Sequence, residues 1–247
     1  MAIAVVTGAS RGIGAATAVL LAQQGWDVCV GYRVDEVSAL AVVEACRHAG
    51  RRAMAVAADM SSPADIDALF ARVDDVLGRL DALVNNAGIV AAKARVDEID
   101  AERLERLMSV NVVGPFLCAG HAVRRMSTRH GGSGGAIVNV SSAAARLGSP
   151  GEYVDYAASK AAIDTMTLGL AREVAAEGIR VNAVRPGIID TEIHASGGQP
   201  DRAARLASVV PMLRPGQASE IADAIAWLCS RGASYVTAAI VDVAGGR

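Results

Sequence analysis

The chain has 247 residues, of which 20% are charged, and its formal net charge at pH 7 is −2. This near-neutral balance, with arginines scattered rather than clustered, argues against a nucleic-acid partner and against an anionic membrane surface. The length suits a single domain spanning residues 1–247, and because only 3% of the residues are aromatic, we expect aliphatic side chains to form the core.

Short apolar runs alternate along the chain with longer segments of helical periodicity. Runs such as AIVNV (136–140) are largely apolar, which is typical of strands buried on both faces. The alternation predicts an α/β fold, with a doubly wound parallel sheet of about seven strands flanked by helices. We expect strands at 2–7, 27–32, 52–57, 82–85, 136–140, 179–185 and 239–243, and helices at 13–24, 36–48, 64–77, 102–128, 155–178 and 219–230.

Residues 187–216 form the one long excursion from this pattern, with two glycines and three prolines between 197 and 215. Long irregular segments inside compact domains are usually functional. We therefore expect this segment to form a lid over a substrate, and a variable surface loop is the alternative.

The reactive side chains indicate no metal site and no disulfides. The four cysteines form no CxxC pair, and the four histidines show no metal-ligand spacing, so we expect buried thiols in a reducing compartment. The first residues, MAIAVVTGAS, lack a basic region and a long apolar stretch of the kind that targets a chain to a membrane. The expected location is cytoplasmic.

A glycine-rich loop, TGASRGIG, directly follows the first expected strand and opens the first expected helix. Gly8 would tighten the turn, while Gly12 and Gly14 would let the backbone approach a phosphate and let the helix pack closely on the strand. The spacing differs from the commonest GxGxxG fingerprint, but a strand, turn and helix in this order are what dinucleotide binding requires.

The end of the second expected strand bears on the choice of dinucleotide. An acidic residue there would bind the ribose 2′-hydroxyl of NAD, but this chain has Tyr32 followed by Arg33, and Arg11 lies in the glycine loop. Two guanidinium groups suit a 2′-phosphate, so NADP(H) is preferred. NAD(H) is the alternative, with Asp35 on the ribose and Arg33 in solvent. Asp59, after the third strand, would bind the adenine amino group or instead begin a helix.

The pentapeptide YAASK places Tyr156 four residues before Lys160, in a chain with only two lysines. On a helix, positions i and i+4 share a face, so the phenol and the ammonium group can point into one space. Both residues could also simply border a packed stripe of the helix.

Six motifs then occur in one order: TGASRGIG, NNAG (85–88), VNV around Asn111, IVNVSS (137–142), YAASK, and RPGIIDT (185–191). In this order and spacing the chain resembles the short-chain dehydrogenase/reductase family over essentially its whole length. The resemblance implies a Rossmann-like fold, an oxidoreductase acting on a small-molecule ketone or secondary alcohol, and a homotetramer. The chain departs from the family at Ala238, where a glycine is common before the last strand.

The resemblance also implies a catalytic set of Asn111, Ser142, Tyr156 and Lys160. Tyr156 would exchange the proton, which requires its pKa to fall by about 3 units from its ordinary value, and Lys160 would favour the phenolate. Ser142 would bind the carbonyl oxygen; the neighbouring Ser141 is the alternative, because the spacing to Tyr156 is one residue longer than usual. Asn111 would hold a water that links Lys160 to solvent.

Further binding residues are implied by position in the family motifs. Thr191 would meet the nicotinamide carboxamide or instead cap a helix, and Tyr153, which has no lysine four residues on, would line the substrate pocket. A 3-oxoacyl thioester and a sugar or polyol both fit as substrates; a sensor without turnover and an S-adenosylmethionine methyltransferase are the alternatives from other classes. The expected cofactor residues are Gly8, Ser10, Arg11, Gly12, Ile13, Gly14, Tyr32, Arg33, Asp59, Met60, Asn86, Ala87, Gly88, Tyr156, Lys160, Pro186, Gly187, Ile189 and Thr191, and the expected substrate residues are Ser142, Ala143, Tyr153, Ile188, His194 and Met212.

Overall fold

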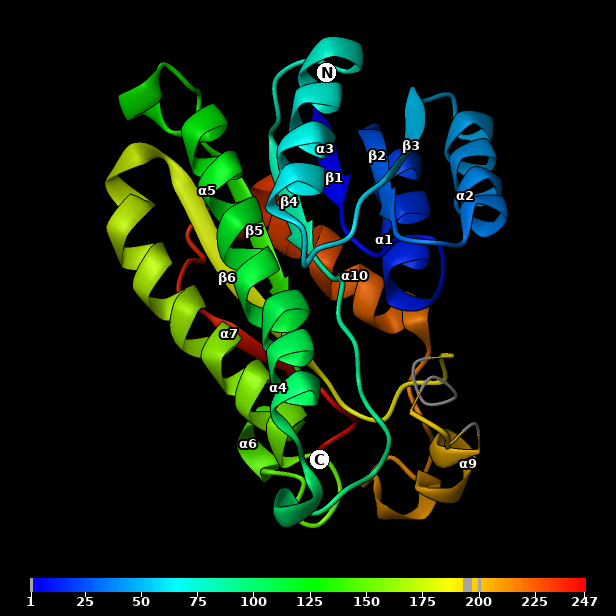
Figure 1. Cartoon of the computed structure of the whole chain (residues 1–247). Coiled ribbons are helices and arrows are strands. Elements are labelled where there is room, and N and C mark those ends of the chain that lie inside the picture. The colour runs from blue at the N-terminus through cyan, green and yellow to red at the C-terminus, as the bar shows by residue number, and fades with distance from the viewer. Residues whose placement is uncertain (1, 193–196, 200) are drawn as a thin grey trace.

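A seven-stranded parallel sheet forms the centre of the molecule (Figure 1). The computed structural model describes residues 2–192, 197–199 and 201–247. The strand order is β3-β2-β1-β4-β5-β6-β7, so the chain winds outward in one direction from β1 and then in the other from β4. The strands are β1 Ile3–Val6, β2 Asp27–Tyr32, β3 Ala53–Ala57, β4 Ala82–Asn85, β5 Gly135–Val140, β6 Ile179–Pro186 and β7 Ile240–Val243.

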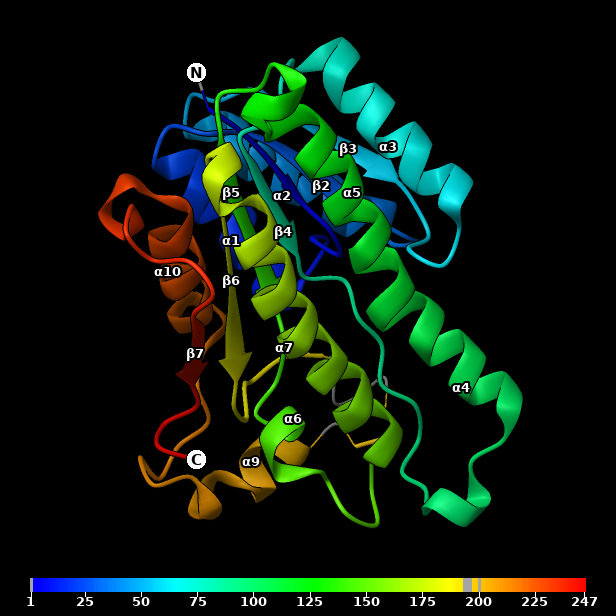
Figure 2. The same cartoon turned by 90° about the vertical axis from the view of Figure 1, so that its left-hand side faces the viewer.

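Helices cover both faces of this sheet (Figures 1 and 2). Successive residues of β1 show why, because Ala4 and Val6 pack with one set of helices while Ile3 and Val5 pack with the other. One layer consists of α1 Gly12–Gln23, α2 Glu36–His48 and α10 Ala218–Cys229. The opposite layer consists of α3 Pro63–Val76, α4 Ala101–Met108, α5 Gly114–Met126 and α7 Val154–Val174, and two short helices, α6 Ala144–Leu147 and α9 Arg202–Arg205, lie near the carboxyl ends of the strands. The predicted doubly wound α/β fold is confirmed.

The predicted helix at 102–128 is interrupted by a π-helical turn over Ser109–Val113, between α4 and α5. Such turns insert one extra residue into a helix and are frequent at functional sites. Here the turn contains the fully buried Asn111. Directly after it, Gly114 lies so close to the third βα loop that a Cβ would be 2.4 Å from the carbonyl oxygen of Met60. The apolar periodicity of this segment does not reveal the turn.

Part of the excursion at 187–216 is structured and lies beyond the carboxyl ends of the strands (Figure 2). Its two ends are joined by a parallel bridge between Ile189 and Gly216. Between them, Ile188, Ala203 and Val210 form a small apolar cluster of their own. His194 lies outside the described residues, as do the positions that would show whether Thr191 caps a helix.

Ala238 adopts a left-handed backbone with φ of 60°, just before β7. Its N–H donates to the carbonyl oxygen of Val181, at 2.8 Å, which holds it against β6. This conformation favours glycine, and it gives a physical reason for the glycine that is common at this position.

None of the helices in the described ranges combines the length and the apolar character that a membrane span requires.

Candidate active site and cofactor groove

The glycine loop between β1 and α1 is packed too tightly for side chains. Gly8 and Gly12 have left-handed φ values of 62° and 56°. A Cβ on Gly8 would lie 2.8 Å from the Cα of Ala87, and one on Gly14 would lie 2.5 Å from the carbonyl oxygen of Gly8. The bare backbone at the N-terminus of α1 is therefore a cradle of the kind that binds phosphate.

The loop after β4 is fixed against the glycine loop by hydrogen bonds. Thr7 Oγ1 accepts from the N–H groups of Asn86 and Ala87, at 3.0 Å each. Asn86 Nδ2 donates to the carbonyl oxygens of Thr7 and Gly8, at 2.9 Å each. The two loops thus form one unit at the point where the strand order reverses, which is where open α/β sheets bind their ligands.

A cavity of about 330 Å³ runs along this unit and joins a second cavity of about 170 Å³. The predicted cofactor residues line one or both of these cavities, with Gly14 as the exception in the described structure. The role of Gly14 is the close packing of α1. The first cavity is lined, among others, by Gly8, Ser10, Arg11, Gly12, Ile13, Tyr32, Arg33, Asp35, Asp59, Met60, Asn86, Ala87, Gly88 and Thr191. The second is lined by Ile13, Asn86, Gly88, Tyr156, Lys160, Pro186, Gly187, Ile189 and Thr191, among others.

The far end of the larger cavity carries both signs of charge. Arg11 and Arg33 are exposed there, and Arg33 Nη1 lies 3.7 Å from Asp59 Oδ2. Asp35 caps α2 by accepting from the Ser38 N–H at 3.0 Å, and this hydrogen bond lowers the pKa of its carboxyl group. Burial raises the pKa of Asp59, but hydrogen bonds from Ser61 and the charge of Arg33 outweigh it and leave that pKa below its ordinary value. Both carboxylates are thus engaged with protein groups.

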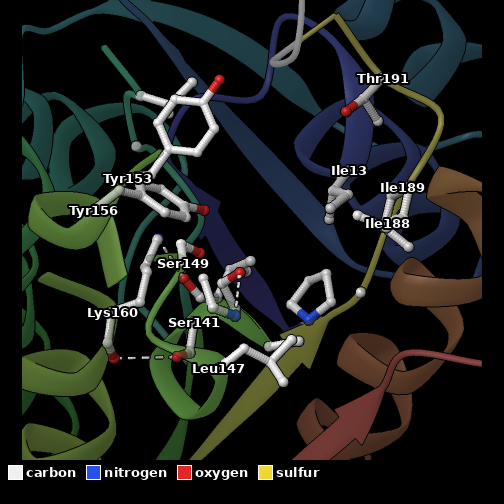
Figure 3. A pocket seen from close by; sticks show the side chains of 18 of the residues that line it. Ile13, Ser141, Leu147, Ser149, Tyr153, Tyr156, Lys160, Ile188, Ile189 and Thr191 are labelled. Carbon is white, nitrogen blue, oxygen red and sulfur yellow. Dashed lines mark hydrogen bonds between the residues drawn. The ribbon is translucent and has the colours of Figure 1, made fainter. Parts of the chain in front are cut away.

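The smaller cavity brings the predicted chemistry together (Figure 3). Tyr153 and Tyr156 reach it side by side from the start of α7, while Ile188, Ile189 and Thr191 form the facing wall. Ser142 and Ala143, also predicted to meet the substrate, line it from the end of β5.

Ser142, and not Ser141, is the serine whose side chain lowers the pKa of Tyr156. Ser142 Oγ also accepts from the Ala144 N–H at 3.1 Å, which fixes its direction. Ser141 also borders the cavity, but it is 2% exposed and its hydroxyl donates to the carbonyl oxygen of Lys160 at 3.1 Å. The geometry therefore supports Ser142 as the residue that meets a carbonyl group.

The expected downward shift of the Tyr156 pKa is not found. Burial raises that pKa, and the hydrogen bond with Ser142 opposes the shift without overcoming it. Lys160 Nζ lies 5.7 Å from the centre of the tyrosine ring. Burial disfavours charge on both groups, so the protein alone keeps the phenol in its neutral form.

Lys160 is buried and hydrogen-bonded to the backbone. Its Nζ donates to the carbonyl oxygen of Val140 at 2.8 Å. Burial lowers the pKa of Lys160 to about 8, although the carboxylate of Asp164, one helical turn further on, raises it. Asp164 is itself paired with Arg185 of β6 at 2.7 Å.

Asn111 lines neither cavity directly. Its Oδ1 accepts from the Ile89 N–H at 2.8 Å, and its Nδ2 donates to the Ile89 carbonyl and to Ser159 Oγ. A Cβ on Gly88 would lie 3.4 Å from both Asn111 Oδ1 and Lys160 Nζ, so only a glycine leaves the space between them open. The water-holding role of Asn111 stays a prediction.

Two further residues bear on the substrate pocket. Met212 is 60% exposed and lines a neighbouring hollow together with Val210 and Gly245, so its assignment to the substrate pocket stays a prediction. Its N–H donates to the Gly245 carbonyl oxygen, which holds this end of the excursion towards the C-terminal residues. Arg202 does line the cavity, and nothing in the periodicity of the excursion could have singled it out.

Comparison with known proteins agrees with this geometry. Residues 8–247 match a family model described as enoyl-(acyl carrier protein) reductase. The chain is 57% identical to the uncharacterized oxidoreductase YgfF of Escherichia coli, over the full length of both, and 43% identical to the cis-4-hydroxycyclohexanecarboxylate dehydrogenase of Sinomonas cyclohexanicum, over 99% of this chain and 95% of that one. Its structure resembles that of a short-chain dehydrogenase from Burkholderia cenocepacia in complex with NADP, with a TM-score of 0.90, 34% identity and coverage of 98% and 96% of the two chains. The chain therefore belongs to the short-chain dehydrogenase/reductase family of oxidoreductases.

Proposed function

We propose that the protein is an NADP(H)-dependent oxidoreductase that interconverts a ketone and a secondary alcohol, with Tyr156 exchanging the proton. The observation that carries this proposal is the meeting of Ser142, Tyr156 and Lys160 in one cavity, which continues into the groove beside the glycine loop. The nicotinamide supplies or accepts the hydride when it is bound. The side chains of the protein would hold the substrate oxygen and move the proton.

Each of these side chains has a position that suits one task. The Ser142 hydroxyl would donate to the carbonyl oxygen as negative charge develops on it. The Tyr156 hydroxyl would then deliver its proton to the same oxygen in reduction, or remove the proton from the alcohol in oxidation. The Lys160 ammonium would stabilise the phenolate that remains after reduction. The side-chain-free backbone of Gly8 and Gly12 would support a bound pyrophosphate, and the close approach of Ala87 to Gly8 requires a glycine there.

NADP(H) is favoured over NAD(H) by the residues at the far end of the groove. Tyr32 stands where NAD enzymes carry an acid, and Arg11 and Arg33 line the wall around it. Asp35 is engaged as the cap of α2 and leaves little reason to assign it to a ribose. The related enzyme from Burkholderia cenocepacia that was crystallised with NADP has the same fold.

The substrate class proposed is a compact secondary alcohol or ketone. The cavity of about 170 Å³ is small for a ligand site, and apolar side chains share its walls with the catalytic groups and with Arg202 and Arg247. The similarity to an enzyme that acts on a hydroxycyclohexanecarboxylate supports a cyclic or branched alcohol rather than a long acyl thioester. A sensor without turnover is disfavoured, because the Ser142–Tyr156–Lys160 set is intact.

The proposal is tested by following NADPH and NADH oxidation against a panel of ketones, aldehydes and acyl thioesters. We expect turnover of a compact ketone, with a higher kcat/KM for NADPH than for NADH. Tight NADPH binding in a thermal-shift assay, with no turnover of any compound, would instead favour the sensor.

We further propose a homotetramer, as the family resemblance implies. Val113 and Phe116, at and after the π-helical turn, are half-exposed apolar side chains that an adjacent subunit would cover. Sedimentation should then give about four times the 25.3 kDa mass of the chain.

A further inference from the structure

A group of charged side chains lies beside the catalytic cavity and has more positive than negative charge. Arg202 Nη2 donates to Glu152 Oε2 at 2.6 Å, and Lys93 Nζ lies 3.4 Å from Glu152 Oε1. The hydrogen bond and charge of Arg202, together with Lys93, hold the pKa of Glu152 below its ordinary value, so its carboxylate stays ionised. Two cations therefore share one anion, and the group has a surplus of one positive charge.

Arg202 is the member of this group that borders the cavity itself. Its side chain is only 12% exposed. Its guanidinium lies 5.1 Å above the ring of Tyr153, which stands beside Tyr156 in the same cavity (Figure 3). Gln199 joins the two residues, since its Oε1 accepts from Arg202 Nη1 at 3.3 Å and its amide donates to the Tyr153 hydroxyl. The guanidinium is thus fixed in position from three sides.

Arg202 still has donors to offer. A guanidinium carries five N–H groups, and the described residues accept from two of the Arg202 groups. The neighbouring Arg205 is half-exposed, is paired with its own carboxylate, Asp201, at 3.7 Å, and donates to the same Gln199 Oε1 at 2.6 Å. Arg202 is thus a fixed, incompletely neutralised cation, largely removed from water, on the wall of a cavity that Arg247 also lines. An anionic ligand group would complete its hydrogen bonds.

We propose that Arg202 determines specificity by binding a carboxylate of the substrate, while the carbonyl or hydroxyl carbon of the same molecule lies at Ser142 and Tyr156. The substrate would be a compact oxo acid and its hydroxy-acid partner, small enough for a cavity of about 170 Å³. This inference rests on the proposed function for the chemistry at Tyr156, but the recognition of an anion by Arg202 can be tested without turnover.

The first experiment compares three ketones of similar shape with NADPH as the reductant: 4-oxocyclohexanecarboxylate, its methyl ester and 4-methylcyclohexanone. Charged hydrogen bonds of this kind are worth roughly a tenfold to hundredfold change in an equilibrium or rate ratio. We expect the wild-type enzyme to favour the acid by about that factor in kcat/KM. In Arg202→Gln that preference should disappear through loss of activity on the acid alone, with the neutral ketone unaffected. The control Arg231→Gln, at an exposed arginine just after α10, should behave as the wild type.

A second variant protects the test against misfolding of the first. Lys93 is 56% exposed and its removal leaves the Arg202–Glu152 pair intact but neutral. Lys93→Gln should therefore fold normally and lower kcat/KM for the acid by a smaller factor, of about threefold, again without an effect on the neutral ketone.

Binding of the acid alone separates this inference from the proposed function. Calorimetric titration of 4-oxocyclohexanecarboxylate should show binding to the wild type that is lost in Arg202→Gln, whether or not any ketone is turned over. If the acid and its ester behave alike in the wild type, or if Arg202→Gln weakens all three compounds equally, Arg202 merely supports Tyr153 and the proposal is overturned. If the acid binds through Arg202 but no ketone is reduced, the anion site stands and the proposed function fails.

Discussion

Lys160 lies on the same face of α7 as Tyr156, 5.7 Å from the centre of its ring, yet its hydrogen bond goes to the carbonyl oxygen of Val140 at 2.8 Å. The ammonium is therefore close enough to stabilise a phenolate but does not contact the phenol directly. Its pKa of about 8 reflects the cost of placing a cation in a buried site. The buried position that lets Lys160 act on Tyr156 therefore also lowers the stability of the folded protein.

Replacing Lys160 by methionine should stabilise the protein and abolish its activity. A lysine pKa lowered from roughly 10.4 to about 8 corresponds to an upper estimate of about 3 kcal/mol of destabilisation at neutral pH. Urea unfolding at pH 7 should show Lys160→Met to be more stable than the wild type, while kcat falls by more than about a hundredfold.

The same residue predicts a pH dependence with a definite sign. Between pH 8 and the pKa of Lys160 in the unfolded chain, the unfolded chain keeps a proton on Lys160 that the folded chain has lost. The unfolding free energy of the wild type therefore gains from Lys160 as the pH rises through this range. The difference in unfolding free energy between Lys160→Met and the wild type should accordingly shrink from pH 8 to pH 10. If this difference in unfolding free energy stays constant over the range, the pKa of Lys160 is not lowered in the folded protein.

Ser142→Ala and Ser141→Ala should have contrasting effects. Ser142 is bonded to Tyr156, so its loss should lower kcat/KM by roughly a hundredfold or more with little change in stability. Ser141 bonds the backbone of Lys160 instead, so its loss should cost about 1 kcal/mol of stability and less activity. The reverse order of activity loss, in steady-state kinetics on both variants, would reassign the carbonyl-binding serine.

Arg33→Ser should weaken the binding of NADPH without weakening the binding of NADH. The exposed guanidinium lines the groove, and its partner among the described residues is Asp59, at 3.7 Å, so it is available to a 2′-phosphate. We expect KM for NADPH to rise by roughly tenfold. Arg231→Ser, an exposed arginine far from both cavities, is the matched control. Equal losses for both cofactors would point to a general disturbance of the groove.

Ala238→Gly should stabilise the protein slightly. The left-handed φ of 60° costs a residue with a Cβ about 1 kcal/mol, and part of the gain is offset by the greater freedom of glycine in the unfolded chain. Thermal unfolding should show a rise of a few degrees at most. A lower melting temperature would mean that the methyl group of Ala238 makes a contact worth more than the strain.

The fold and the glycine loop could be predicted from the sequence because they depend on local patterns, whereas the family resemblance supplied the catalytic set. Alternating apolar runs place the strands, and the backbone demands of Gly8 and Gly12 can be read directly from the residue type. Ser142, Tyr156 and Lys160 meet because their segments end at the same edge of a parallel sheet.

What could not be predicted depends on contacts between distant segments. The π-helical turn at Asn111 follows from packing of Gly114 against the third βα loop, which no periodicity records. The raised pKa of Tyr156 depends on how deeply the folded protein buries it, and the spacing of Tyr156 and Lys160 does not reveal that depth. Arg202 meets Glu152 across 50 residues of chain, and a backbone hydrogen bond holds Met212 beside Gly245.

The most direct test of the account is the rate of NADPH-dependent ketone reduction by Tyr156→Phe, with NADPH affinity measured on the same protein. The exposed Tyr235→Phe serves as its control. The account predicts a loss in kcat of at least about a hundredfold for Tyr156→Phe, since the proton donor is removed, with NADPH binding retained. A variant that binds NADPH normally and reduces the ketone at close to the wild-type rate would contradict the central role of Tyr156.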